Sequence, residues 1–150
     1  MANYYGMTRT NCFKVTDPER LKKIINNVYC CEDAMELHER RDENGDTSYV
    51  FCGYGTIEGL THDWETSNNE DREFIDDADF DIFTDELQKI VAPNDAIIIT
   101  EIGNEQLRYL TAFSTVITKE GVYYIDLGHA SVEVAKKSLN NPKWKTKMEY

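Results

Sequence analysis

The first thirty residues show the two periodicities that distinguish a strand from a helix. Residues 8–15 alternate between polar and apolar side chains, which predicts a β-strand. In residues 16–28 the apolar side chains recur at helical spacing, at Leu21, Ile24, Ile25 and Val28. Thr16 and Glu19 have the spacing of an N-terminal capping box, so we expect the helix to begin at Thr16.

The next segment has the pattern of an antiparallel hairpin. Two runs that favour β-structure, 34–41 and 47–55, flank the pair Asn44-Gly45, which suits a tight turn. Residues 56–78 have weak periodicity and many turn-forming residues. They predict a long acidic loop, with a short helical turn near its end.

The second half of the chain again contains helical and strand patterns. Residues 79–91 carry apolar side chains at helical spacing, and Asp79 or Asp81 could cap this helix. Runs of β-branched and aromatic residues predict three strands, at 96–103, 107–118 and 121–127. A last helix is expected over 131–139, starting at Ser131.

The order of these elements, β-α-β-β-α-β-β-β-α, indicates an α+β fold. We expect one antiparallel sheet with helices packed on one face, of ferredoxin-like type. The length of 150 residues fits a single domain, 1–150, with an acidic segment at 58–86 and a short basic tail at 141–150. No apolar run is long enough for a membrane span or a secretion signal, so we expect a cytoplasmic protein.

Negative charge is concentrated in one segment. The chain has a net charge of −12, and residues 58–86 alone contain 12 acidic residues and one basic residue. Within them, NNEDREFIDDADFDIFTDEL (68–87) has nine acidic positions. Such a surface repels nucleic acid, whose binding depends on Lys and Arg, and it attracts basic proteins. We therefore expect no direct contact with DNA or RNA.

The acidic segment lacks a calcium-binding signature. Asp77, Asp79 and Asp81 have the spacing that opens a calcium loop. The glycine required at the sixth position is replaced by Ile82, and the glutamate required at the twelfth by Gln88. We expect neither a metal nor a cofactor.

Catalytic signatures are also missing from the sequence. It contains no nucleophile elbow, no phosphate-binding glycine loop and no HExxH motif. Glu101 is placed like a nuclease acid at a strand end, but no nearby Lys completes an ExK pattern. The four cysteines show no paired spacing, so we expect reduced thiols; zinc bound with His38 or His62 is the less favoured alternative. We expect no enzyme, and a metal-dependent enzyme using the acidic loop remains the alternative.

Aromatic residues on the predicted strands could form a platform on which bases stack. They lack the Lys and Arg that normally accompany such a platform, so we interpret them as core residues. These residues are Tyr49, Phe51, Tyr54, Tyr109 and Phe113.

The acidic segment is therefore the candidate binding site, and its partner should be a basic protein that handles nucleic acid. Interleaved apolar residues could anchor that partner. The expected partner-binding residues are Asp63, Trp64, Glu65, Glu70, Asp71, Glu73, Asp76, Asp77, Asp79 and Asp81. The alternative is that Trp64, Phe74 and Phe80 hold the segment against the core and the acids only maintain solubility.

Three stretches of the chain resemble a known group of proteins. They are ANYYGMTRTNCFKV (2–15), ELQKIVAPNDAIIITEIGNEQLRYLTAFSTVIT (86–118) and NPKWKTKMEY (141–150). The chain is similar to small acidic proteins encoded on prophages, plasmids and conjugative elements of Firmicutes. That group has no assigned catalytic residues that could be transferred to this sequence.

The resemblance implies a role against host defence. Mobile elements of this kind carry anti-CRISPR and anti-restriction proteins, and several of these inhibitors mimic nucleic acid with acidic surfaces. We therefore expect an inhibitor that binds a Cas effector nuclease and blocks DNA or guide-RNA binding. An anti-restriction protein, or a regulatory interaction module that uses the sheet or the tail, is the alternative.

Overall fold

The computed structural model describes residues 4–66, 77–105 and 109–147. Its strands are β1 (Tyr4–Thr10), β2 (Tyr29–Cys30), β3 (Glu36–Arg41), β4 (Thr47–Tyr54), β5 (Ile57–Gly59), β6 (Ile97–Glu105), β7 (Tyr109–Thr118) and β8 (Gly121–Asp126). Its helices are α1 (Pro18–Asn27), α2 (Phe80–Ile90) and α3 (Leu127–Ser138). No helix in these ranges is long and apolar enough to cross a membrane.

The strands form one large antiparallel sheet and one small one. The large sheet has the order β3-β4-β1-β6-β7-β8, and β2 pairs with β5 beside it. The part made by β1, α1, β3, β4, α2 and β6 has the strand order of a ferredoxin-like fold, in which α1 and α2 are the two crossover helices. The expected α+β class is confirmed, and β7 and β8 extend the sheet beyond its ferredoxin-like part.

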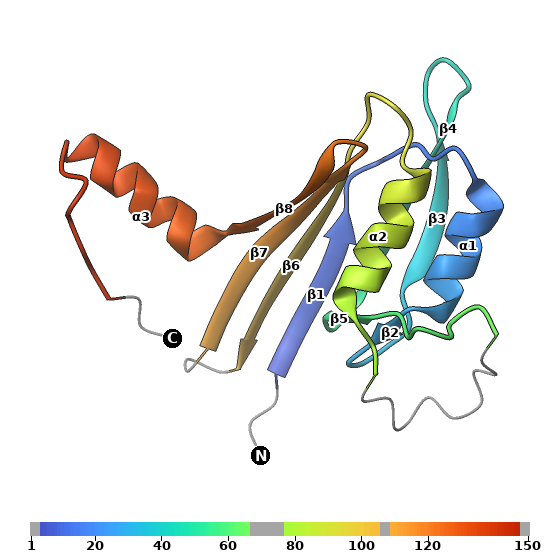
Figure 1. The fold of residues 1–150 in the computed structure, drawn as a ribbon, viewed down its shortest axis with the longest axis horizontal. Coiled ribbons are helices and arrows are strands. Elements are labelled where there is room, and N and C mark those ends of the chain that lie inside the picture. Colours follow the sequence, from blue (N-terminus) through green and yellow to red (C-terminus); the bar gives the residue numbers. More distant parts are fainter. Residues whose placement is uncertain (1–3, 67–76, 106–108, 148–150) are drawn as a thin grey trace.

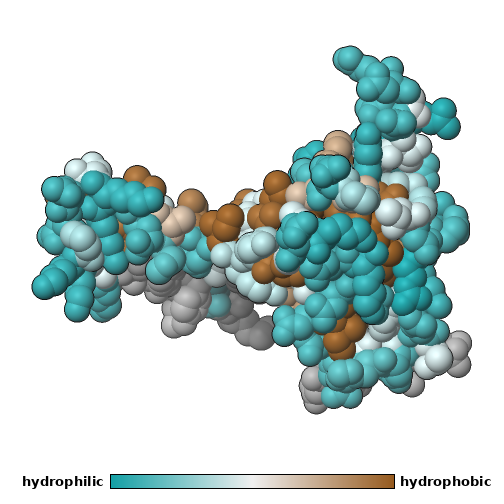
Figure 2. All heavy atoms as spheres, turned by 45° about the horizontal axis from the view of Figure 1, so that its top comes forward, coloured by the Kyte–Doolittle hydropathy of each residue, from teal (hydrophilic) through white to brown (hydrophobic). Residues whose placement is uncertain are grey.

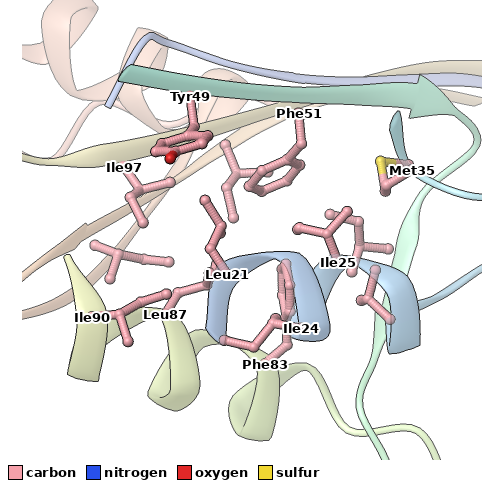
Figure 3. Close-up of a cluster of buried hydrophobic side chains, with 14 of the residues drawn as sticks. Leu21, Ile24, Ile25, Met35, Tyr49, Phe51, Phe83, Leu87, Ile90 and Ile97 are labelled. Atoms are coloured by element: carbon pink, nitrogen blue, oxygen red, sulfur yellow. The ribbon is translucent and has the colours of Figure 1, made fainter. Parts of the chain in front are cut away.

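The hydrophobic core lies between the sheet and the first two helices. We call the covered side of the large sheet its inner face and the opposite side its outer face. Figure 3 shows side chains of α1 and α2 meeting those of β4 and β6. The fully buried ring of Phe51 contacts the buried rings of Phe13 and Phe83 edge to face.

Two of the expected helix starts were wrong. The first helix is capped by Asp17, whose carboxylate accepts the N–H of Arg20, and Thr16 lies before the cap. The last helix is capped by Asp126, which accepts the N–H of His129. It therefore begins four residues before Ser131. The cap of α2 by Asp79 is as expected.

The first strand also differs from its prediction of 8–15. It begins at Tyr4, because residues 4–10 pair with β6 along their whole length. After Thr10 the chain leaves the sheet, and Phe13 and Val15 keep only single bridges, to Tyr49 and Val91. The hairpin after α1 is confirmed, but a five-residue loop, 42–46, connects its strands.

The third helix lies apart from the other two. It follows β8 without a connecting residue and projects from the edge of the sheet (Figure 1). It contacts β7 and β8, yet none of its residues is buried. We call residues 127–147 the C-terminal arm.

Candidate binding surface

A β-bridge between Leu60 and Asp79 connects two parts of the acidic segment 58–86. The N–H of Leu60 donates to the carbonyl of Asp79 at 3.1 Å, and the reverse hydrogen bond measures 2.8 Å. Gly59 permits this approach, because a Cβ at its position would lie 2.1 Å from the Asp79 carbonyl oxygen. The bridge thus ties the end of β5 to the residue that caps α2.

Arg20 on α1 holds the turn at 61–66, which follows the bridge. Its guanidinium lies 4.7 Å from the centroid of the Trp64 ring, and it forms ion pairs with Glu65 and, at 3.1 Å, with Glu86. The hydrogen bond from Arg20 keeps the pKa of Glu65 below its ordinary value. Trp64 itself is only 4% exposed, so the turn at 61–66 packs firmly against α1.

Most carboxylates of this region nevertheless face solvent. They come from β5, from the turn after it and from the N-terminal half of α2, which the bridge and the contact between β5 and α2 bring together. Few bases stand among them, so they form a strongly negative end of the molecule. We call this group the acidic surface: Glu58, Asp63, Glu65, Asp77, Asp79, Asp81 and Asp85.

Two of these acids also have local structural roles. The carboxylate of Asp79 accepts the N–H of Asp81 at 2.8 Å and so caps α2. Asp81, in the first helical turn, lies where the helix dipole favours negative charge. It also accepts the hydroxyl of Tyr124 from β8 at 3.4 Å. Substituting Asp79 therefore affects the cap of α2 as well as the charge, whereas Asn at Asp81 keeps a side-chain oxygen that can accept from Tyr124.

The structure places six of the ten expected binding residues. Asp63, Glu65, Asp77, Asp79 and Asp81 are exposed, whereas Trp64 is buried and contributes to the core. The buried position of Trp64 is the one expected from the alternative interpretation, in which it holds the segment in place. The remaining four, Glu70, Asp71, Glu73 and Asp76, lie outside the described residues, as does Phe74.

Two anchoring residues were not found from the sequence. Arg20 lies 44 residues before Trp64, and Tyr124 lies 43 residues after Asp81, so no local pattern connects either pair. The only sequence signal is the surplus of acidic residues in 58–86, which indicates that an arginine near this segment will form an ion pair with one of its carboxylates.

A group of possible metal ligands lies elsewhere, on the outer face. The ligand atoms of Glu36, His38 and Cys52 are within 4.8 Å of one another, and no other such group occurs in the described ranges. Three protein ligands are fewer than the four of a structural zinc site, and Arg9 lies directly opposite Cys52 in the sheet. Asp77, Asp79 and Asp81 do not form such a group among the described residues.

Burial changes the pKa of two other groups that could react, Glu101 and Cys30. Glu101 is 2% exposed and accepts the N–H of Ile57 at 3.0 Å, so it joins β5 to the sheet. Burial raises its pKa above the ordinary value. The four cysteines are free thiols, and burial raises the pKa of Cys30 to about 12, which makes that thiol unreactive.

The aromatic residues of the sheet are divided between its faces. Tyr49 and Phe51 are buried on the inner face, as expected for core residues. Tyr54 is 61% exposed on the outer face, Phe113 is half-buried, and the side chain of Tyr109 lies outside the description. The expected set therefore does not form one stacking platform.

Fold and surface together define an α+β protein with an extended ferredoxin-like sheet and one acidic end. No protein-family model, curated protein or solved structure matches this chain.

Proposed function

We propose that this protein is a non-enzymatic inhibitor that binds a nucleic-acid-handling enzyme of host defence. Its acidic surface would enter the cationic cleft in which that enzyme holds DNA or guide RNA. From the resemblance to mobile-element proteins, we infer more specifically that the target is a Cas effector nuclease in the cytoplasm of a bacterial host. A restriction enzyme is the alternative target.

The concentration of charge is the observation that carries this proposal. One segment of 29 residues, 58–86, contains 12 of the 28 acidic residues and one of the 16 basic residues. Exposed carboxylates held by folded elements resemble the charge of a phosphate backbone. The complementary electrostatic potential raises the rate at which such a surface associates with a basic cleft. The Leu60–Asp79 bridge and the contact of Arg20 with Trp64 hold the described parts of this segment in place.

Four substitutions test the proposal with little effect on the fold. Asn can replace Asp63, Asp77, Asp81 and Asp85, which leaves the capping residue Asp79 in place. The matched control replaces Glu19, Glu43, Glu120 and Glu133 by Gln; these exposed or half-exposed acids lie outside the acidic surface. Each variant removes four negative charges, so only the position of the lost charge differs.

The measurement is DNA cleavage by a purified, guide-loaded Cas nuclease titrated with each protein. We expect the chain to inhibit cleavage, and its affinity to fall steeply as salt screens the charges. The Asp variant should lose inhibition and the control should keep it. Equal inhibition by both variants would exclude the acidic surface as the site. Absence of inhibition by the native chain would exclude this class of target, and a restriction enzyme would be assayed in the same way.

A further inference from the structure

The outer face of the large sheet is not covered by any described part of the chain. Along β6, Ile97, Ile99 and Glu101 are buried on the inner face, whereas Ile98 and Ile102 alternate with them and are exposed. Because directly paired residues share a face, the registers of β1, β4, β7 and β8 identify the rest of the outer face. Its exposed large hydrophobic side chains are Tyr5, Met7, Tyr54, Ile98, Ile102, Leu110, Tyr123 and Ile125.

This apolar area is at least as large as the largest apolar patches of typical monomers. The three tyrosines, Tyr5, Tyr54 and Tyr123, are 65%, 61% and 52% exposed. At roughly 200 Å² for a whole tyrosine side chain, they alone present on the order of 350 Å². The five aliphatic residues add to this, and patches of that size mark interaction sites. On the opposite side, which carries α1 and α2, Figure 2 also shows hydrophobic side chains at the surface along the waist between α3 and the rest of the molecule.

The C-terminal arm also leaves hydrophobic side chains exposed, because its helix α3 is not packed over a sheet face. Leu127 and Val134 are 60% and 66% exposed and lie two helical turns apart on one side of α3. Leu139, just after the helix, is also exposed. Since β8 passes directly into α3 without a linker, the helix extends away from the sheet and does not fold back over the outer face (Figure 1).

Charge favours a meeting of these two surfaces. Residues 127–147 contain five lysines and one acidic residue, so the C-terminal arm is basic. An apolar hollow of about 330 Å³ on the outer face is lined by Tyr5, Tyr54 and Leu110, with Glu32 among its lining residues. A second hollow beside it includes Asp33, Glu36 and one base, Arg9. A basic arm with apolar side chains complements this face in both respects.

We propose that the outer face is covered by a second copy of this chain, whose C-terminal arm lies across it. Each copy has one arm and one exposed outer face. Around a two-fold axis the arm of each copy covers the outer face of the other, so the assembly closes as a dimer. The acidic surface takes no part in this contact. The inference therefore stands apart from the proposed function and can fail without it.

Sedimentation equilibrium of the full chain tests the proposal in three variants. Ile102→Lys places a charge in the outer face, and Val134→Lys places one on the arm. Thr47→Lys is the matched control, at an exposed position beside the β3–β4 loop. We expect a dimer across about 1–100 µM, since a standard interface binds in the micromolar range or tighter. Either interface lysine should raise the dissociation constant at least about 100-fold, because it would bury an unpaired charge.

The outcomes divide clearly. A monomeric native chain throughout this range, or an assembly larger than a dimer, would overturn the proposal. A dimer that survives Val134→Lys would overturn it too, and that exposed helical substitution cannot unfold the sheet. Carbodiimide cross-linking of a mixture of ¹⁵N-labelled and unlabelled protein is the second measurement. Cross-links between the two isotopes from Lys136 or Lys137 to Glu32, Asp33 or Glu36 support the contact, and links within single chains only contradict it.

Discussion

Replacing Glu101 tests whether a buried carboxyl group lowers or raises the stability of this fold. The side chain is 2% exposed on the inner face of β6. It accepts the N–H of Ile57 at 3.0 Å and the hydroxyl of Thr8 at 3.4 Å. Burial outweighs these two hydrogen bonds and raises the pKa of Glu101. The fold therefore disfavours the charged form of this carboxyl group.

Two variants separate the charge from the hydrogen bond. Glu101→Gln keeps an oxygen acceptor and removes the charge, whereas Glu101→Met removes both and nearly keeps the volume. The Thr8 hydroxyl also donates to the carbonyl of Gly55 at 2.8 Å, so only the Ile57 N–H loses its partner. A buried unpaired N–H costs about 1–3 kcal/mol. We expect Met to be less stable than Gln by that amount, and Gln to be at least as stable as Glu at pH 7.

The pH dependence of the native chain has a definite sign. Because the folded pKa of Glu101 is raised, the unfolded chain ionises first as the pH increases. Stability is therefore lost as pH rises from the ordinary Glu value to the folded pKa, and it is regained on acidification. Relative to the Gln variant, the native chain should become more stable as the pH is lowered. The total change measures the pKa shift at about 1.4 kcal/mol per unit.

Urea unfolding followed by circular dichroism provides the free energies, at intervals between about pH 4 and pH 7. Glu120→Gln, an exposed change in the β7–β8 turn, is the control for charge alone. A native-minus-Gln difference that stays constant with pH, or that increases towards neutral pH, would refute the argument. Equal stability of the Met and Gln variants would show that the Ile57 N–H does not depend on this carboxyl group.

Three further changes test the base of the acidic segment and its surroundings. Gly59→Ala should destabilise the fold by at least about 3 kcal/mol in urea unfolding, because its Cβ would collide with backbone; Gly45→Ala, with free space around it, should cost only about 1 kcal/mol. Arg20→Ala should cost about 1–2 kcal/mol and shift the fluorescence of Trp64 to longer wavelength, since the ring loses its cationic cover. The Cys30 thiol, with its pKa of about 12, should react with Ellman's reagent only on unfolding in a variant whose other three cysteines are replaced by Ser; a fast reaction of that variant would contradict the effect of burial.

The helices and hairpins that rest on local patterns could be predicted from the sequence. Helix α2 has both its apolar spacing and its capping Asp79 within the same short segment. The start of β1 could not be predicted, because residues 4–7 do not alternate and their strand state comes from pairing with β6, about 95 residues away. The pair β2 and β5 is too short for any periodicity and exists only through its tertiary partners.

The candidate surfaces divide in the same way. The acids of the acidic surface are visible in the sequence, whereas their anchor Arg20 is a long-range contact of Trp64. The open outer face was not predicted either. In the apolar run Ile97-Ile98-Ile99 every residue favours a strand, and nothing local distinguishes the two buried side chains from the exposed Ile98 between them.

The acidic surface and the outer face lie on different elements, so their effects on function should be separable. A two-fold dimer would carry two acidic surfaces, one on each copy, and a target with two basic clefts would be held by both copies at once. Val134→Lys should then leave the binding of one copy to one cleft unchanged and remove only the gain from double attachment. The four Asp→Asn substitutions should have the reverse effect, a loss of target binding by a protein that still sediments as a dimer. If both sets of substitutions abolished both properties, the two surfaces would have to be parts of one site, and the separation argued from the sheet registers would be wrong.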